Sequence, residues 1–158
     1  MNPFQQLHDL CVEKKVSIAT AESCTAGFLA AKITSIAGAS SFFKGGIIAY
    51  QNDIKINHLG VSKSLIKEKT EVCAEVVQQM AQGVRNKFSA DFSVATSGYA
   101  GPTGGSELNP IGTVFIAISS KEKTISKRFV FLGDRESVVS QSVISGAEFL
   151  MEVLKNNK

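Results

Sequence analysis

A three-layer α/β/α fold with a mixed, mostly parallel sheet is predicted for this chain from three observations. Short apolar runs alternate with stretches of helical periodicity, a pattern typical of strands joined by crossover helices. Near the carboxyl end, two β-type runs are separated only by a charged turn, which predicts one antiparallel hairpin. The 158 residues are the length of one ordinary domain, and no repeat, low-complexity tract or linker divides them. We therefore expect a single domain over residues 1–158.

The first half of the chain is expected to begin with a helix and then to alternate strands with helices. Apolar side chains recur every three or four positions after Phe4, which predicts the opening helix. The short apolar run that ends at Ala21 suits a buried strand, and Ser23 is a suitable N-cap for the helix after it. The expected elements are a helix over 4–15, a strand over 16–21, a helix over 24–33, a strand over 42–50 and a short helix over 52–58.

The second half is expected to hold the longest amphipathic helix, three strands and a final helix. An apolar stripe at helical spacing marks the long helix, which should end near Phe88. Gly133 and Asp134 are suited to open the last helix. The expected elements are a helix over 73–88, a strand over 92–96, a glycine-rich loop over 97–112, strands over 113–119 and 125–131, and a helix from about 135 to 154.

Composition narrows the classes of function. The net charge is +3 and the basic residues are scattered, so we expect no nucleic-acid partner. No run of about 18 apolar residues occurs, and residues 1–4 lack the features of a signal peptide, so we expect no membrane association. The three cysteines have no paired spacing, which favours a reducing compartment and predicts a cytoplasmic protein.

The first candidate for a ligand-binding segment is the end of the strand before Ser23. Unpaired N–H groups at the start of a helix suit a phosphate or a carboxylate. A capping box would need Glu or Gln three residues after Ser23, but Ala26 stands there, so the donors should stay available. The alternative is that Ser23 only caps the helix.

The second segment contains Ser40, Tyr50 and Lys55. A serine hydroxyl is a weak nucleophile until a base takes its proton. Neither histidine of the chain has a polar setting, so a Ser–His–Asp triad is not expected. A lysine desolvated by apolar neighbours can act as the base, and Lys55 stands between Ile54 and Ile56. The alternative is an ordinary exposed lysine.

The third segment is the glycine-rich stretch over residues 96–106, directly after a strand. Its glycines would let backbone N–H groups approach an anion closely. It matches neither the P-loop nor the dinucleotide-binding fingerprint. No sequence cluster of metal ligands occurs either, so the segment predicts an anion site of unspecified kind.

Taken in order along the chain, these segments resemble the CinA C-terminal family, the nicotinamide-nucleotide amidases. The resemblance covers nearly all of residues 5–153. It implies the three-layer fold and hydrolysis of nicotinamide mononucleotide to nicotinic acid mononucleotide and ammonia. It also implies a serine-based mechanism without metal or cofactor, in a homo-oligomer. In many members a larger amino-terminal domain precedes this one, which is expected to be missing here. The motifs that carry the resemblance are residues 20–27, 36–40, 50–55, 97–102, 110–114 and 133–135.

The resemblance also implies roles for individual residues. Ser40 is the expected nucleophile and Lys55 its base, with Tyr50 orienting the base or relaying the proton. Ser97 would hold the substrate or an oxyanion, and Arg135 would be a charge partner. The phosphate would be bound by Ser23, Thr25, Gly98, Gly101, Gly104 and Gly105.

Two alternatives stay open on the sequence. Ser23 could be the nucleophile in place of Ser40. The chain could also be a ligand-binding or regulatory module that keeps the fold and a phosphate site without turnover, although the intact Ser40, Tyr50 and Lys55 favour an enzyme.

Overall fold

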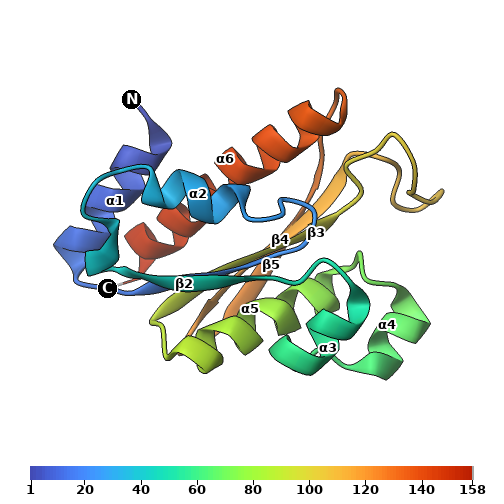
Figure 1. Cartoon of the computed structure of the whole chain (residues 1–158), viewed down its shortest axis with the longest axis horizontal. Coiled ribbons are helices and arrows are strands. Elements are labelled where there is room, and N and C mark those ends of the chain that lie inside the picture. The colour runs from blue at the N-terminus through green and yellow to red at the C-terminus, as the bar shows by residue number, and fades with distance from the viewer. Residues whose placement is uncertain (158) are drawn as a thin grey trace.

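In the computed structural model, which describes residues 1–157, five strands form one mixed sheet in the order β2-β1-β3-β4-β5 (Figure 1). β1 pairs in parallel with both β2 and β3, whereas β4 is antiparallel to β3 and to β5. The strands are β1 (Ile18–Glu22), β2 (Phe43–Ile48), β3 (Phe92–Gly98), β4 (Thr113–Ser120) and β5 (Thr124–Val130).

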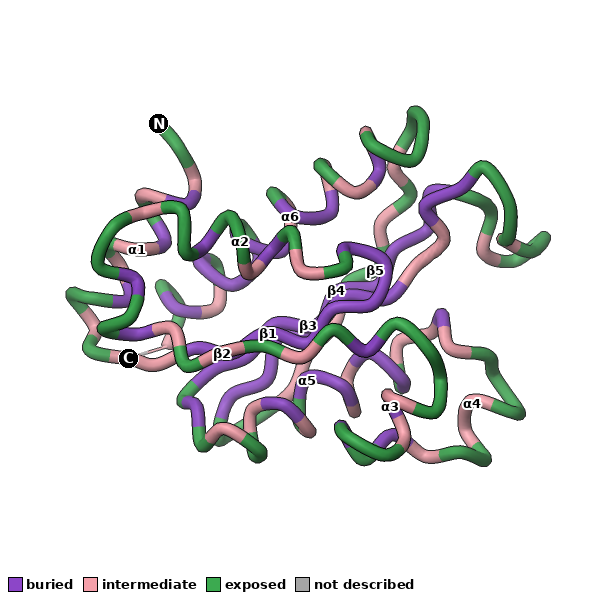
Figure 2. The backbone as a smooth tube through the Cα atoms, in the orientation of Figure 1, coloured by how far each residue is buried: buried purple, intermediate pink, exposed green. Residues whose placement is uncertain are grey.

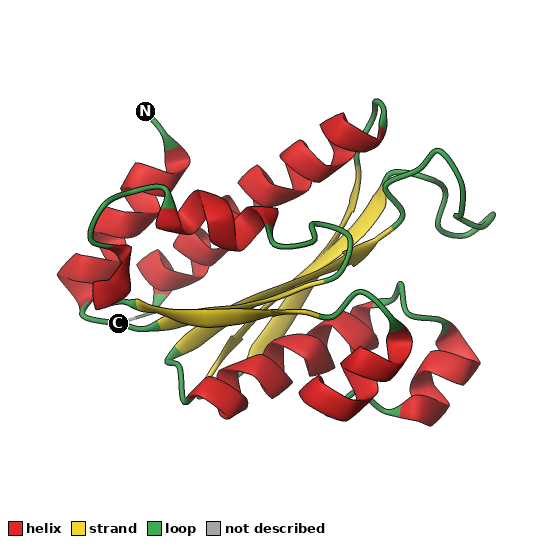
Figure 3. Cartoon of the chain, in the orientation of Figure 1, coloured by secondary structure: helices red, strands yellow, loops and turns green. Residues whose placement is uncertain are grey.

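Helices cover both faces of this sheet, which makes three layers (Figure 3). One face carries α1, α2 and α6, which pack on one another, and the other carries α5, on which α3 and α4 lie. The predicted α/β/α class and the mixed sheet are therefore confirmed. The helices are α1 (Pro3–Lys14), α2 (Phe28–Thr34), the 3₁₀ turn η1 (Ala39–Ser41), α3 (Asn52–Leu59), α4 (Lys63–Lys69), α5 (Ala74–Phe88) and α6 (Arg135–Asn156).

Burial follows from the position of each strand. Every residue of β1 and β4 is buried, because these strands have neighbours on both sides and helices on both faces. The edge strand β2 instead alternates half-buried and exposed residues. Figure 2 shows the buried segments concentrated along the central strands. Two apolar clusters, one on each face of the sheet, form the core.

The sequence prediction missed one helix and misplaced the start of another. α4 was not expected because it buries no residue and its lysines obscure any apolar stripe. α2 begins at Phe28 rather than near Ser23, because Ala26 and Gly27 adopt positive φ values of 48° and 94° and form a turn. Residues 23–27 are therefore a loop over the end of β1. No helix within residues 1–157 combines the length and apolar character needed to cross a bilayer.

Gly83 on α5 allows α3 to pack closely. A Cβ at this position would lie 1.9 Å from the carbonyl oxygen of Leu59, the last residue of α3. Only a residue without a side chain lets the two backbones approach to this distance. Since α3 also carries the buried Lys55, the packing at Gly83 fixes where that lysine lies.

We expect Gly83→Ala to lower the free energy of unfolding by about 1–3 kcal/mol, because the added methyl group must push α3 away from α5. Urea denaturation measures this loss. The matched control is Lys87→Ala, an exposed position on the same helix. Equal stability of the two variants would contradict the close packing described here.

Candidate active site

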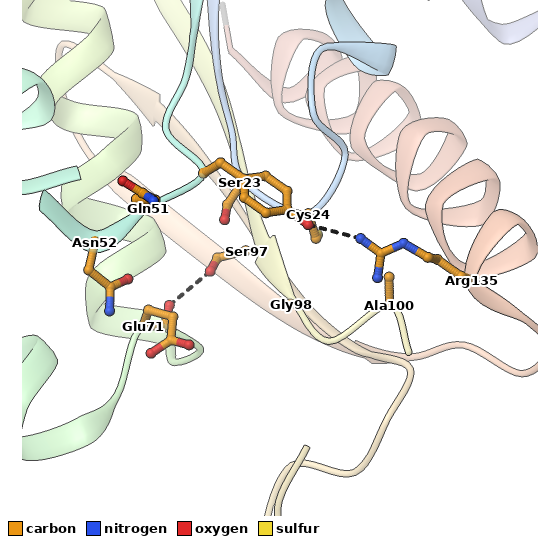
Figure 4. A pocket seen from close by; sticks show the side chains of 10 residues that line it. Ser23, Cys24, Gln51, Asn52, Glu71, Ser97, Gly98, Ala100 and Arg135 are labelled. Atoms are coloured by element: carbon orange, nitrogen blue, oxygen red, sulfur yellow. Dashed lines mark hydrogen bonds between the residues drawn. The ribbon is translucent and has the colours of Figure 1, made fainter. Parts of the chain in front are cut away.

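A cavity of about 450 Å³ lies where β1, β2 and β3 end. Because these strands are parallel, the loops after them meet at one edge of the sheet, where ligands of open α/β sheets usually bind. Three segments complete the wall: the loop after β3, the segment before α5, and the first turn of α6 (Figure 4). The residues that line the cavity are Ser23, Cys24, Tyr50, Gln51, Asn52, Glu71, Ser97, Gly98, Ala100 and Arg135.

The shape of the first loop is set by Glu22, the last residue of β1. Its side chain is only 1% exposed, and its carboxylate accepts hydrogen bonds from the backbone N–H groups of Leu29 at 2.8 Å and Ala30 at 3.1 Å. The Thr25 hydroxyl donates a third bond at 2.6 Å. An internal carboxylate therefore occupies the amino-terminal end of α2. The prediction that the N–H groups at the start of this helix are free to bind a ligand is wrong for Leu29 and Ala30.

Thr25 is a structural residue rather than a phosphate ligand. It is fully buried, and its hydroxyl contacts the Thr96 hydroxyl at 2.8 Å besides donating to Glu22. Its predicted contact with substrate phosphate is thus wrong, because the side chain is directed into the protein.

Ser23 is the serine that the loop presents to the cavity. Its backbone N–H donates to the Thr96 carbonyl at 3.0 Å, which fixes the residue beside the end of β3. Its hydroxyl makes no hydrogen bond to any residue from 1 to 157, and Figure 4 shows it directed towards the cavity. The side chain is held in place while its oxygen remains available for a ligand.

Lys55 lies behind the same cavity. It is fully buried, and its ammonium donates to the Tyr50 carbonyl at 3.0 Å. Burial lowers the pKa of Lys55, while the negative charge of Glu71 acts in the opposite direction. Of the two alternatives left by the sequence, the structure has the desolvated lysine.

Ser40 does not lie near Lys55, so the predicted Ser40–Lys55 pair is wrong. Ser40 is exposed in η1, which directly precedes β2, whereas Lys55 follows that strand. The 6 residues of β2 separate the two ends, and a strand of that length spans about 20 Å. The sequence could not reveal this, because it placed both residues next to the same strand without showing that they flank opposite ends.

Tyr50 and Arg135 form one side of the cavity. Arg135 donates to the Tyr50 hydroxyl at 2.9 Å and to the Gly101 carbonyl at 2.7 Å. The phenol therefore faces Arg135, while the Tyr50 carbonyl accepts from the Lys55 ammonium. Arg135 reaches this place because it begins α6, where Asp134 caps the helix by accepting from the N–H of Ser137.

The β3 loop contributes less than predicted. Ser97 and Gly98 line the cavity, and the Ser97 hydroxyl donates to the Glu71 carbonyl at 2.8 Å. Gly101, Gly104 and Gly105 do not line it: their positive φ values of 84°, 93° and 82° shape a loop that extends away from the sheet (Figure 1). A role of these three glycines in binding phosphate stays a prediction.

Sequence reasoning missed part of the lining. Cys24, Gln51, Asn52 and Ala100 adjoin residues that were singled out, so their proximity could have been inferred. Glu71 had no such signal, because it precedes α5 in a segment without a glycine motif. Burial raises the pKa of the Cys24 thiol to about 12, so the thiol is protonated at neutral pH.

Comparison with known proteins agrees with this architecture. The sequence matches the family model of the CinA C-terminal domain over residues 2–154. The chain belongs to the CinA C-terminal domain family. A CinA-like protein of Flavobacterium psychrophilum is 41% identical over 151 residues, and a putative competence-damage inducible protein of Halothermothrix orenii is 39% identical over 151 residues.

The match covers most of this chain but only part of each relative. It covers 95% of this chain but 36% and 37% of the two relatives, so this CinA domain spans about a third of their length. Among solved structures, a competence-damaged protein (CinA) superfamily protein from Klebsiella pneumoniae superimposes with a TM-score of 0.93 at 32% identity. It covers 99% of both chains.

We expect Glu22→Gln to destabilise this CinA domain by about 2–4 kcal/mol, because the amide can no longer accept from three donors in a buried site. Urea denaturation monitored by circular dichroism gives the value. Glu13→Gln, at an exposed position of α1, is the control and should be neutral. A Glu22→Gln protein as stable as the control would show that the carboxylate does not organise the loop.

Proposed function

We propose that this CinA domain hydrolyses the carboxamide of nicotinamide mononucleotide to give nicotinic acid mononucleotide and ammonia. One observation carries the proposal: the unengaged hydroxyl of Ser23 lines a cavity together with Tyr50, and the carbonyl of Tyr50 accepts a hydrogen bond from the buried Lys55, whose pKa is lowered by burial. A serine nucleophile with a lysine base is the minimum machinery for amide hydrolysis without a metal. The choice of nicotinamide mononucleotide as substrate rests on the resemblance of the sequence to the nicotinamide-nucleotide amidases.

In the proposed reaction, Lys55 accepts the Ser23 proton while the serine oxygen attacks the carboxamide carbon. The tetrahedral intermediate collapses as the Lys55 proton passes to the leaving nitrogen, so the C–N bond breaks and ammonia departs. The resulting ester is attacked by water, which transfers a proton to Lys55. The Ser23–acyl bond then breaks, the serine oxygen takes back that proton, and the acid is released.

Two neighbouring groups suit the orientation of the substrate. The Ser97 hydroxyl donates to the Glu71 carbonyl, so its lone pairs are left to accept from the carboxamide NH₂. Arg135 has further N–H donors besides the two used on Tyr50 and Gly101, and they suit the phosphate. Action in the cytoplasm, assembly as a homo-oligomer and independence from metals stay predictions.

Replacement of Ser23 by alanine tests the assignment of the nucleophile. We expect Ser23→Ala to lower kcat/KM for ammonia release from nicotinamide mononucleotide by roughly a thousandfold or more, because no acyl-enzyme can form. Isothermal titration calorimetry should still detect binding of the mononucleotide. The control is Ser40→Ala, which should keep full activity because Ser40 lies outside the cavity.

Three other outcomes are informative. Loss of activity in Ser40→Ala with full activity in Ser23→Ala would overturn the assignment of the nucleophile. A wild-type protein that binds the mononucleotide without releasing ammonia would favour the non-catalytic module. A protein that neither binds nor hydrolyses it would overturn the proposed function altogether.

The role of Lys55 predicts a pH dependence. A base must be neutral, so kcat/KM should rise with pH through the pKa of Lys55, at a lower pH than an exposed lysine would give. Lys55→Met keeps the buried apolar stem and removes the amine. It should lower kcat by about a hundred- to ten-thousandfold. Retention of the rising limb in this variant would assign that limb to another group.

A further inference from the structure

The cavity is lined by two side chains of opposite charge. Glu71 and Arg135 both line it, and within residues 1–157 neither takes part in an ion pair shorter than 4.0 Å. In Figure 4 they lie on different sides of Ser23. The site therefore presents a negative and a positive group, with the proposed nucleophile between them.

The position of Glu71 is fixed by its backbone. The Ser97 hydroxyl donates to its carbonyl at 2.8 Å, and the next residue, Val72, is 1% exposed within the core of that face. The Val72 carbonyl in turn accepts from the Asn109 amide at 3.4 Å. The half-buried side chain thus extends from an anchored segment, so its charge lies on that side of the cavity.

The field of Glu71 reaches the reaction centre. Its negative charge acts to raise the pKa of Lys55, although the two side chains form no ion pair within residues 1–157. Such a carboxylate opposes the approach of an anion and the growth of negative charge on a carbonyl oxygen. In an amidase site of this kind it calls for a compensating positive charge on the ligand.

We propose that Glu71 is a specificity-determining residue that selects substrates whose ring carries a positive charge. This inference rests on the proposed function: nicotinamide mononucleotide has a cationic pyridinium ring at one end and an anionic phosphate at the other. Glu71 attracts the ring cation, and Arg135 binds the phosphate. The opposed charges orient the ligand so that its carboxamide meets Ser23.

The test compares two ligands that differ in ring charge. Benzamide riboside 5′-phosphate has the same carboxamide, ribose and phosphate as nicotinamide mononucleotide, but its ring is neutral. Dissociation constants are measured by calorimetry in the Ser23→Ala background, which prevents turnover. Adding Glu71→Gln should weaken binding of the mononucleotide roughly tenfold and leave the neutral ligand unchanged.

Two features keep the comparison specific. The two ligands share the carboxamide, ribose and phosphate, so any effect of Glu71→Gln on those contacts cancels in their ratio. Retained affinity for the neutral ligand demonstrates an intact fold. Glu68→Gln, at an exposed position of α4 that does not line the cavity, is the matched control and should alter neither constant.

The outcomes separate the two proposals. An unchanged ligand preference in the Glu71→Gln variant, together with ammonia release by the wild-type protein, would overturn the role of Glu71 and leave the proposed function standing. Failure of the wild-type protein to release ammonia from the mononucleotide, with no binding by Ser23→Ala, would overturn both. A tenfold fall in the preference for the cationic ring would support the role assigned to Glu71.

Discussion

The whole site depends on the hydrogen bonds of Glu22 at the end of the central strand β1. Its carboxylate accepts from two N–H groups in the first turn of α2, those of Leu29 and Ala30. Its backbone carbonyl accepts from Ala49, just beyond β2, at 2.8 Å. The next N–H, that of Ser23, donates to Thr96 of β3 at 3.0 Å. One short segment thus connects three parallel strands at the edge where the cavity lies. A buried carboxylate without these donors would cost several kcal/mol, so the loop around it has little freedom.

Lys55 is the second buried polar group on which the site depends, and its situation is the reverse of that of Glu22. Among residues 1–157 its ammonium has one hydrogen-bond partner, the Tyr50 carbonyl, and burial favours the neutral amine. α3 can hold it there because Gly83 lets this helix lie against α5. A fully satisfied buried charge gives rigidity, whereas a poorly compensated one gives a group that can change its protonation state.

The sequence predicted the layers well because alternation of apolar runs and helical stretches depends on local periodicity. It also identified Lys55, Tyr50, Ser97 and Arg135, which the structure brings to one cavity or its wall. The sequence-based predictions failed for residues whose position depends on the tertiary structure. Ser40 and Lys55 lie at opposite ends of β2, which the sequence does not reveal. Thr25 is buried and donates its hydroxyl hydrogen to Glu22, so its side chain is not at the surface. The glycines after residue 100 shape a projecting loop, which composition alone cannot distinguish from an anion cradle.

Glu22 and Glu71 differ in the number of hydrogen-bond donors around their carboxylates, and this difference determines whether each can bind a ligand. Both lie at or beside the cavity, yet Glu22 accepts three hydrogen bonds and is sealed from solvent, while the Glu71 carboxylate has no ion-pair partner within residues 1–157. A saturated carboxylate has no capacity left for a ligand, so it can only organise the chain. An unsaturated one at a fixed place gains most from a ligand of opposite charge. The same reasoning applies to Arg135, whose two internal bonds orient the guanidinium without neutralising it. Glu71 and Arg135, which form no ion pair within residues 1–157, are therefore the charged groups that a ligand in the cavity would meet.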